Sequence, residues 1–312
     1  MKIVFLDSDS LSGSINVEGD LSHFGTVTAF QNTKDSEIKN RIIDADIVVT
    51  NKVVLGSDIL RYCTKLKLIC VVATGLDNID VAFATENGIL VKNVTKYSTL
   101  SVAQHCFSLL LYHYRSLKKN IDYVNTHQWE KNNSFTFQES SIRDLNKKNW
   151  GVVGLGDIGL QVATIAKCFG ANVQYFSTSG KNSNNDFFRV DLETLMSTSD
   201  IISIHCPLNK LTKGLINAQN LVLLRPKATV INLARGAIVK EEDMARVLET
   251  ADLTYITDVL SAEPINQSHP LYSFVGNEEK LIVTPHVAWA SELSQKTLWE
   301  AVLGHIRAFC VP

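Results

Sequence analysis

The segment from Gly151 to Gly159, read GVVGLGDIG, constrains the fold of this chain more than any other. An apolar run from Trp150 to Val153 leads into a stretch with three closely spaced glycines, and a helix-like pattern follows that ends at Gly170. This order of residues predicts a strand, a tight turn and a helix, in which the glycines occupy the turn and the start of the helix.

Each of these glycines has its own physical reason to lack a side chain. Gly154 permits the tight turn, Gly156 lets a pyrophosphate approach the backbone, and Gly159 lets the helix pack closely on the strand. The helix N-terminus then offers N–H groups and the positive end of its dipole to phosphates. A turn without a ligand is the alternative, but the flanking strand and helix favour a dinucleotide-binding site.

Short apolar runs alternate with helical patterns along almost the whole chain. The helical patterns include residues 36–44, 162–170 and 241–249. Such alternation predicts a doubly wound α/β fold with parallel strands and with helices on both faces of the sheet. The expected strands are residues 3–6, 47–49, 68–72, 152–155, 173–176, 201–204, 229–233 and 281–283.

The position of the glycine motif predicts the domain organisation. A chain of 312 residues favours two domains, since one domain takes about 150 residues. Nearly half of the chain precedes the motif, and long helical patterns at residues 100–119 and 292–309 flank the motif-bearing part. We therefore expect a Rossmann-type cofactor domain, residues 100–286, inserted into a flavodoxin-like substrate domain made of residues 1–99 and 287–312.

The composition argues against several classes of partner. The net charge of -2 gives no basic footprint for nucleic acid. No apolar run reaches the roughly 18 residues of a membrane span, and the N-terminal segment is too short for a secretory signal. The six cysteines are scattered without a CxxC pair, which is typical of reduced thiols in the cytoplasm and not of disulfides or a metal site.

Four further segments each follow an apolar strand. Ligands of open α/β sheets gather at the carboxyl ends of the strands, so Arg235, Glu263 and His286 are expected to converge on one crevice. The segments are HCPL (His205–Leu208), NLARGAIV (Asn232–Val239), DVLSAEP (Asp258–Pro264) and TPHVAWA (Thr284–Ala290).

An arginine, a carboxylate and a histidine have a natural joint use. Arginine binds a carboxylate through two parallel hydrogen bonds, and histidine transfers protons near neutral pH. A carboxylate beside a histidine raises the pKa of the imidazole and fixes its tautomer. Taken singly, Arg235 and Glu263 read as surface residues, and a lone histidine such as His23 or His113 reads as structural. The occurrence of Arg235, Glu263 and His286 after three strands of one domain favours a catalytic role for the three residues.

With these motifs the chain resembles the D-isomer-specific 2-hydroxyacid dehydrogenases over nearly its whole length. The other matching segments are VATGLDNID ending at Asp80, SVAQH (Ser101–His105) and HPL (His269–Leu271). Within that family, three features look most like glycerate dehydrogenases, also called hydroxypyruvate reductases. These are Trp289 after TPHVA, TNK at Thr50–Lys52 and HQWEKNNSF at His127–Phe135.

The resemblance implies roles for the matching residues. Arg235 would hold the substrate carboxylate and polarise the C2 carbonyl, His286 would be the acid–base, and Glu263 would pair with His286. The backbone at Thr74 and Gly75 would also contact the substrate. The cofactor would be NAD(P), with Asp258 on the nicotinamide carboxamide. The other implied cofactor contacts are Gly154, Gly156, Asp157, Ile158, Gly159, Ser177, Lys181, Cys206 and Pro207.

The choice between NAD and NADP depends on Ser177. An NAD-preferring member would have an acid there for the ribose hydroxyls. The acid is missing, no arginine replaces it immediately, and Lys181 could accept a 2′-phosphate. We therefore expect NADP(H) to be slightly favoured over NAD(H), with a relaxed NAD site as the alternative.

The resemblance implies hydride transfer between the cofactor and C2 of a small D-2-hydroxy or 2-keto acid, most closely hydroxypyruvate to D-glycerate. D-lactate or glyoxylate-type reduction is an alternative within the family, and a non-catalytic dinucleotide-sensing protein is an alternative on the same fold. A homodimer is also implied, through the helix at residues 100–119. The apolar face of that helix could equally be internal core; its members are Val102, Phe107, Leu110, Leu111 and Tyr114.

Overall fold

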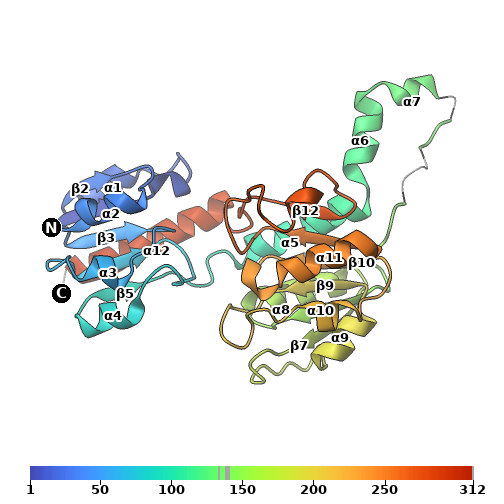
Figure 1. The fold of residues 1–312 in the computed structure, drawn as a ribbon. Coiled ribbons are helices and arrows are strands. Elements are labelled where there is room, and N and C mark those ends of the chain that lie inside the picture. Colours follow the sequence, from blue (N-terminus) through green and yellow to red (C-terminus); the bar gives the residue numbers. More distant parts are fainter. Residues whose placement is uncertain (133, 138–140, 311–312) are drawn as a thin grey trace. The chain divides into compact units, whose positions relative to one another are not determined.

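The structure is a computed structural model that describes residues 1–132, 134–137 and 141–310. Residue 133 of the HQWEKNNSF segment and residues 311 and 312 of the expected substrate domain lie outside the described residues. Contacts within the chain define two compact units, Met1–Ser98 with Ala290–Pro312, and Thr99–Trp289. Each unit is built on a parallel sheet with helices, so the predicted α/β class is confirmed (Figure 1).

The sheet of the first unit has the strand order β2-β1-β3-β4-β5, and all of its described pairs are parallel. This is the flavodoxin-like order. The three inner strands are almost entirely buried and rich in Ile and Val, as strands covered on both faces should be. The strands are β1 (Lys2–Phe5), β2 (Thr26–Ala29), β3 (Ile47–Thr50), β4 (Leu68–Val71) and β5 (Leu90–Lys92).

Helices cover this sheet, and the last one comes from the far end of the chain. Ile38, Ile42 and Leu60 pack in one core cluster with strand side chains such as Val48. Trp299 of the last helix stacks on Phe5 of β1 with ring centroids 6.0 Å apart. The C-terminal segment therefore completes the first unit. The helices are α1 (Val17–Ser22), α2 (Asp35–Ile42), α3 (Ser57–Leu60), α4 (Val81–Glu86) and α12 (Glu292–Cys310).

The sheet of the second unit has the order β12-β11-β10-β9-β6-β7-β8, again with parallel pairs. The order reverses at β6, which lies between β7 and β9; such a switch point is where open α/β sheets bind ligands. The strands are β6 (Asn149–Val153), β7 (Asn172–Phe176), β8 (Phe188–Arg189), β9 (Ile201–Ile204), β10 (Ala228–Asn232), β11 (Leu253–Thr257) and β12 (Leu281–Val283).

The two faces of this sheet belong to two separate core clusters. Val152 packs in one cluster with residues of α5 and α8, and Val153 packs in the other with residues of α9, α10 and α11. Neighbouring strand residues point to opposite faces, so helices cover both sides, as the alternation predicted. The helices are α5 (Thr99–Tyr114), α6 (Leu117–Asn125), α7 (Gln128–Lys131), α8 (Asp157–Cys168), α9 (Leu192–Thr198), α10 (Ala218–Leu221) and α11 (Glu241–Thr250).

The helix expected at residues 100–119 is broken. It ends at Tyr114, and Ser116 takes a left-handed conformation with φ of 49° before α6 begins. Of the five residues expected on the apolar face of this helix, four are buried in the core of the unit, and the fifth, Leu111, packs against that core. This face is therefore internal core. The described side chains of α6 include no buried one, and α6 and α7 project from the rest of the unit (Figure 1).

All six cysteines are free thiols, and four of them are buried. Burial raises the pKa of Cys106 to about 12, so this thiol stays protonated at neutral pH. In the part of the chain that the structure describes, no helix combines the length and the apolarity needed to cross a membrane.

Candidate active site

The glycine turn after β6 has the close contacts that exclude side chains. Gly154 has φ of +92°, and a Cβ built on it would lie 2.8 Å from the Cβ of Cys206. A Cβ on Gly159 would lie 2.1 Å from the carbonyl oxygen of Gly154. The expected strand, turn and helix are present, because β6 leads through this turn directly into α8.

Gly156 differs from the other two glycines because its surroundings are open. It is the N-cap of α8, and a Cβ built on it would meet no atom within 4 Å. Asp157 and Ile158 are the first two residues of the helix. The first turn of an α-helix has N–H groups without intrahelical acceptors, and the helix dipole favours negative charge there. Open space at Gly156 and a helix N-terminus together fit a pyrophosphate.

The turn after β7 lies against the glycine turn. Ser177 directly follows β7 and is 5% exposed. Its carbonyl accepts the N–H of Gly180 at 3.2 Å, and its Oγ accepts the N–H of Asn182 at 3.3 Å. The side-chain amide of Asn182 donates to the carbonyl of Leu155 at 2.7 Å. The backbone around Ser177 is thus fixed where a Rossmann fold binds the adenosine ribose. Lys181 is exposed in the same loop.

The HCPL segment follows β9 on the other side of β6. Cys206 is 2% exposed, and burial raises the pKa of its thiol to about 12. Pro207 is exposed, and its carbonyl accepts the hydroxyl of Thr212 at 2.6 Å. Both ring nitrogens of His205 are buried, and neither has a hydrogen-bond partner among the described residues. Burial lowers the pKa of His205 to about 3, so its imidazole is neutral.

His286 and Glu263 form the expected pair. Nδ1 of His286 lies 2.7 Å from Oε2 of Glu263, and both side chains are partly accessible. Oε1 of Glu263 accepts the N–H of Leu260 at 2.8 Å, which orients the carboxylate. His286 has φ of +56°, an uncommon conformation for a residue other than glycine. Its carbonyl accepts the indole N–H of Trp289 at 3.0 Å. These contacts hold the imidazole in one orientation.

Asp258 anchors the segment that carries His286. The carboxylate is 2% exposed and accepts the hydroxyl of Thr284 at 2.5 Å and the N–H groups of Val287 and Ala288 at 2.9 and 2.8 Å. Nε2 of His105 lies 3.0 Å from Oγ1 of Thr284, and burial lowers the pKa of His105. Sequence reasoning missed this positioning set, although SVAQH contained His105. The expected contact of Asp258 with a nicotinamide carboxamide stays a prediction.

The loop that carries Arg235 is held from two sides. Asn232 at the end of β10 donates to the carbonyl of Arg235 at 3.0 Å and accepts the N–H of Ala234 at 3.1 Å. A Cβ on Gly236 would lie 2.0 Å from the carbonyl carbon of Leu260. Since Leu260 also donates to Glu263, the structure brings the loops of Arg235 and Glu263 together. The half-buried Arg235 donates to the carbonyl of Ala234 at 2.8 Å.

A second acid–histidine contact lies buried beneath these loops. Nε2 of His269 lies 3.0 Å from Oε2 of Glu241, although the contact is poorly aligned for a hydrogen bond. Glu241 also accepts the N–H of Ser261 at 2.9 Å. Both side chains are almost fully buried, and Glu241 supports the Leu260–Glu263 turn through Ser261. Only the HPL resemblance pointed to this place, and nothing in the sequence pattern singled out Glu241.

Thr74 and Gly75 belong to the first unit and follow the carboxyl end of β4. The hydroxyl of Thr74 donates to the carbonyl of Val94 at 3.0 Å, and the amide of Asn93 donates to the carbonyl of Thr74 at 2.6 Å. These bonds define the backbone conformation at Thr74. The expected contact of Thr74 and Gly75 with substrate stays a prediction.

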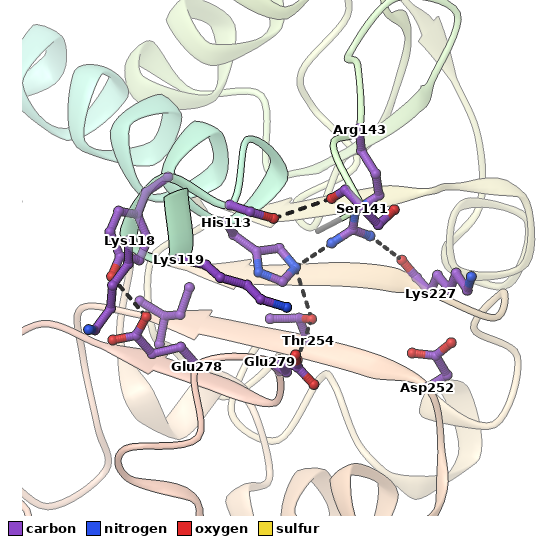
Figure 2. A pocket seen from close by; sticks show the side chains of 13 residues that line it. His113, Lys118, Lys119, Ser141, Arg143, Lys227, Asp252, Thr254, Glu278 and Glu279 are labelled. Carbon is purple, nitrogen blue, oxygen red and sulfur yellow. Dashed lines mark hydrogen bonds between the residues drawn. The ribbon is translucent and has the colours of Figure 1, made fainter. Parts of the chain in front are cut away.

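A pocket of about 450 Å³ lies at the amino ends of β10 and β11, the opposite end of the sheet from the glycine turn, and Figure 2 shows the side chains that line it. Lys227 and Asp252 line it, and they directly precede β10 and β11, respectively. At its centre, Arg143 donates to Nε2 of His113. Burial and the charge of Arg143 lower the pKa of His113 to about 4. This histidine is therefore neutral at pH 7.

A family model described as "D-isomer specific 2-hydroxyacid dehydrogenase, NAD binding domain" matches residues 107–288. The chain belongs to this family. The match spans the glycine turn and the loops of Arg235, Glu263 and His286. The resemblance read from the sequence is thereby confirmed.

The similarity of this dehydrogenase to its relatives extends over nearly its whole length. It is 32% identical to a hydroxypyruvate reductase of Blautia hydrogenotrophica, with 99% of this chain and 97% of the relative covered. It is also 32% identical to a glycerate dehydrogenase of Methylorubrum extorquens, with coverages of 99% and 96%.

Two solved structures share the fold at 26% sequence identity and a TM-score of 0.85. One is an acyclic imino acid reductase in complex with NADPH and D-Arg, with coverages of 99% and 97%. The other is a D-lactate dehydrogenase of Aquifex aeolicus in complex with NAD and lactic acid, with coverages of 98% and 95%.

Proposed function

We propose that this 2-hydroxyacid dehydrogenase reduces hydroxypyruvate to D-glycerate. The observation that carries the proposal is the oriented pair of His286 and Glu263, 2.7 Å apart, next to the loop of Arg235 in an NAD-binding domain. The choice of substrate is supported by two whole-length relatives that carry the names hydroxypyruvate reductase and glycerate dehydrogenase. Trp289, which bonds to the carbonyl of His286, is one of the features by which the sequence resembles them.

The side chains divide the work between binding and proton transfer. The planar guanidinium of Arg235 binds the substrate carboxylate through two parallel hydrogen bonds. The imidazole of His286 donates a proton to the C2 oxygen during reduction and takes it back during oxidation. Glu263 accepts from Nδ1 of His286, which leaves Nε2 as the nitrogen that exchanges the proton with substrate. When bound, the nicotinamide supplies or receives the hydride at C2.

The cofactor is proposed to be NAD(P), with NADP(H) slightly favoured. The glycine turn and the open space at Gly156 suit the pyrophosphate. Residues 177–181, which directly follow β7, include no acid that would repel a 2′-phosphate. Both forms of the cofactor occur in similar folds, since one neighbour is complexed with NADPH and another with NAD.

The test is a side-by-side kinetic comparison on the purified protein. Hydroxypyruvate, glyoxylate and pyruvate are each assayed with NADH and with NADPH. We expect the highest kcat/KM with hydroxypyruvate. A higher value for glyoxylate or pyruvate would assign the chain to another reductase of the family. Binding of the dinucleotide without turnover of any keto acid would instead support the dinucleotide-sensing alternative.

We further propose a homodimer in which the projecting α6 and α7 contact the second copy. Their exposed apolar side chains favour burial against a partner surface; they include Leu117, Ile121, Val124 and Trp129. The double variant Ile121→Glu with Val124→Glu should convert a dimer to a monomer in sedimentation. A monomeric wild-type protein would contradict this proposal.

A cytoplasmic location is proposed from the six free thiols.

A further inference from the structure

The side chain of Arg189 ends beside the turn that follows β7, although Arg189 lies twelve positions after Ser177 in the sequence. Its exposed guanidinium donates from Nη1 to the carbonyl of Gly180 at 3.0 Å. A Cβ built on Gly180 would lie 3.7 Å from Nη2 of Arg189. The parallel pairing of β7 with β8, in which Tyr175 faces Arg189, produces this approach. Sequence spacing alone therefore pointed only to Lys181.

The turn itself is well defined. Gly180 has φ of +72° and closes the turn through its N–H to the carbonyl of Ser177. Arg189 is thus fixed to the turn that begins at Ser177, where an NAD-preferring enzyme has its ribose-binding acid. Among the described residues, no carboxylate forms an ion pair with Arg189 or Lys181.

A guanidinium carries five N–H donors, and the bond to Gly180 uses one of them. The remaining donors are held in a planar fork that matches the geometry of a phosphate. Lys181 adds a second positive charge on a flexible stem in the same loop. Two cations that form no ion pair with a described carboxylate, one of them oriented by the backbone, suit a dianion such as a phosphate monoester better than neutral ribose hydroxyls.

We propose that Arg189, together with Lys181, binds the 2′-phosphate of NADP(H). Arg189 is then the residue that determines preference for the phosphorylated cofactor. This inference rests on the proposed function, because it concerns the cofactor site of the same enzyme. The alternative is that Arg189 only stabilises the turn. In that case its loss would affect phosphorylated and unphosphorylated nucleotides equally.

The test measures binding of cofactor fragments that carry no nicotinamide, so it does not depend on turnover. Dissociation constants of adenosine 2′,5′-bisphosphate and of 5′-AMP are measured by calorimetry for the wild type, Arg189→Gln and Arg189→Lys. Arg61→Gln is the matched control, since Arg61 is also exposed and donates to one backbone carbonyl, that of Ser57 at 2.8 Å.

We expect Arg189→Gln to weaken binding of the bisphosphate by about ten- to a hundredfold, the range of one charged hydrogen bond. Binding of 5′-AMP should stay within about twofold, as one neutral contact at most is altered. Arg189→Lys should fall in between because it keeps the charge and loses the fork. Arg61→Gln should match the wild type.

Equal weakening of both fragments by Arg189→Gln, or a wild type that binds both equally well, would overturn the inference. Melting temperatures show whether each variant is folded. If Arg189→Gln is not folded, the binding constants of Arg189→Lys decide whether Arg189 contacts the 2′-phosphate. A wild type that discriminates between the fragments but reduces no keto acid would refute the proposed function and leave the role of Arg189 standing.

Discussion

Gly236 packs against the backbone of Leu260 so closely that a Cβ on Gly236 would lie 2.0 Å from the Leu260 carbonyl carbon. Arg235 directly precedes this contact, and Leu260 donates its N–H to Glu263 at 2.8 Å. One backbone contact therefore sets the separation between the loop that carries the arginine and the loop that carries the acid.

Gly236→Ala should disturb both loops together. The added methyl meets backbone atoms, which cannot rotate away as a flexible side chain can, so overpacking should cost about 1–3 kcal/mol of stability. kcat/KM should fall because Arg235 and Glu263 both move. The displaced Arg235 should raise KM, and the displaced Glu263 should lower kcat. Thermal melting and steady-state kinetics measure this.

The matched control is Gly304→Ala in α12, where the new Cβ meets no atom within 4 Å. Because alanine is the better helix former, Gly304→Ala should be neutral or stabilise by up to about 1 kcal/mol. If Gly236→Ala is as harmless as Gly304→Ala, the two loops do not depend on each other.

Replacement of His286 tests the acid–base assignment. Asparagine is the preferred replacement because His286 has φ of +56°, and asparagine adopts that region more readily than most residues. Loss of the proton donor should lower kcat by about 10²–10⁴-fold, while the dissociation constant of the dinucleotide stays nearly unchanged. Glu263→Gln should lower kcat less, since it keeps a side chain near Nδ1 but loses the charge. Wild-type turnover in His286→Asn would remove His286 from the mechanism.

The sequence allowed the strand, turn and helix at the glycine motif to be predicted because steric requirements there are local. It also placed Arg235, Glu263 and His286 after strands that share one sheet edge. A strand was expected before DVLSAEP, but the bounds of β11 could not be given because its residues LTYIT mix hydroxyls with apolar side chains; all five are buried. The break at Ser116 was missed because both α5 and α6 have helical patterns.

Residues that act through long-range contacts could not be predicted. The hydroxyl of Thr284 donates to Asp258 and also contacts His105, which lies 179 positions from Thr284 in the sequence. Arg189 reaches Gly180 only because two strands pair in one register. Neither arrangement leaves a local pattern, so a fold was needed to find them.

Arg235→Lys tests how the substrate is anchored. Lysine keeps the positive charge but lacks the planar fork, so one of the two parallel hydrogen bonds to the carboxylate is lost. KM for hydroxypyruvate should rise by about tenfold or more, the value of one charged hydrogen bond. kcat should fall as well if the guanidinium polarises the carbonyl. The measurement is a substrate titration at saturating cofactor, and unchanged kcat/KM would argue against a substrate contact.

The neutral His113 predicts a loss of stability in acid. Burial and Arg143 lower its pKa to about 4, against about 6.5 in an unfolded chain. Between these values the unfolded state binds a proton that the folded state does not, so stability is complete above about pH 6.5 and falls as the pH drops toward about 4. His113→Gln cannot titrate, so between pH 7 and pH 5 it should lose about 1–2 kcal/mol less than the wild type in urea unfolding. His23→Gln, at an exposed position, is the control. If His113→Gln loses as much stability between pH 7 and pH 5 as the wild type does, the lowered pKa of His113 is refuted.

Ser177→Asp tests cofactor preference at the place where the chain departs from an NAD-type ribose site. The new carboxylate would stand at the end of β7, where it can accept hydrogen bonds from ribose hydroxyls and repel a 2′-phosphate. One charged contact of this kind is worth about 1.5–3 kcal/mol, so the ratio of kcat/KM for NADPH to that for NADH should fall by roughly ten- to a hundredfold. Ser183→Asp adds the same charge at an exposed position further along the loop and should change the ratio little. A wild type that strongly prefers NADH, with a ratio that Ser177→Asp leaves unchanged, would show that Ser177 does not face the ribose.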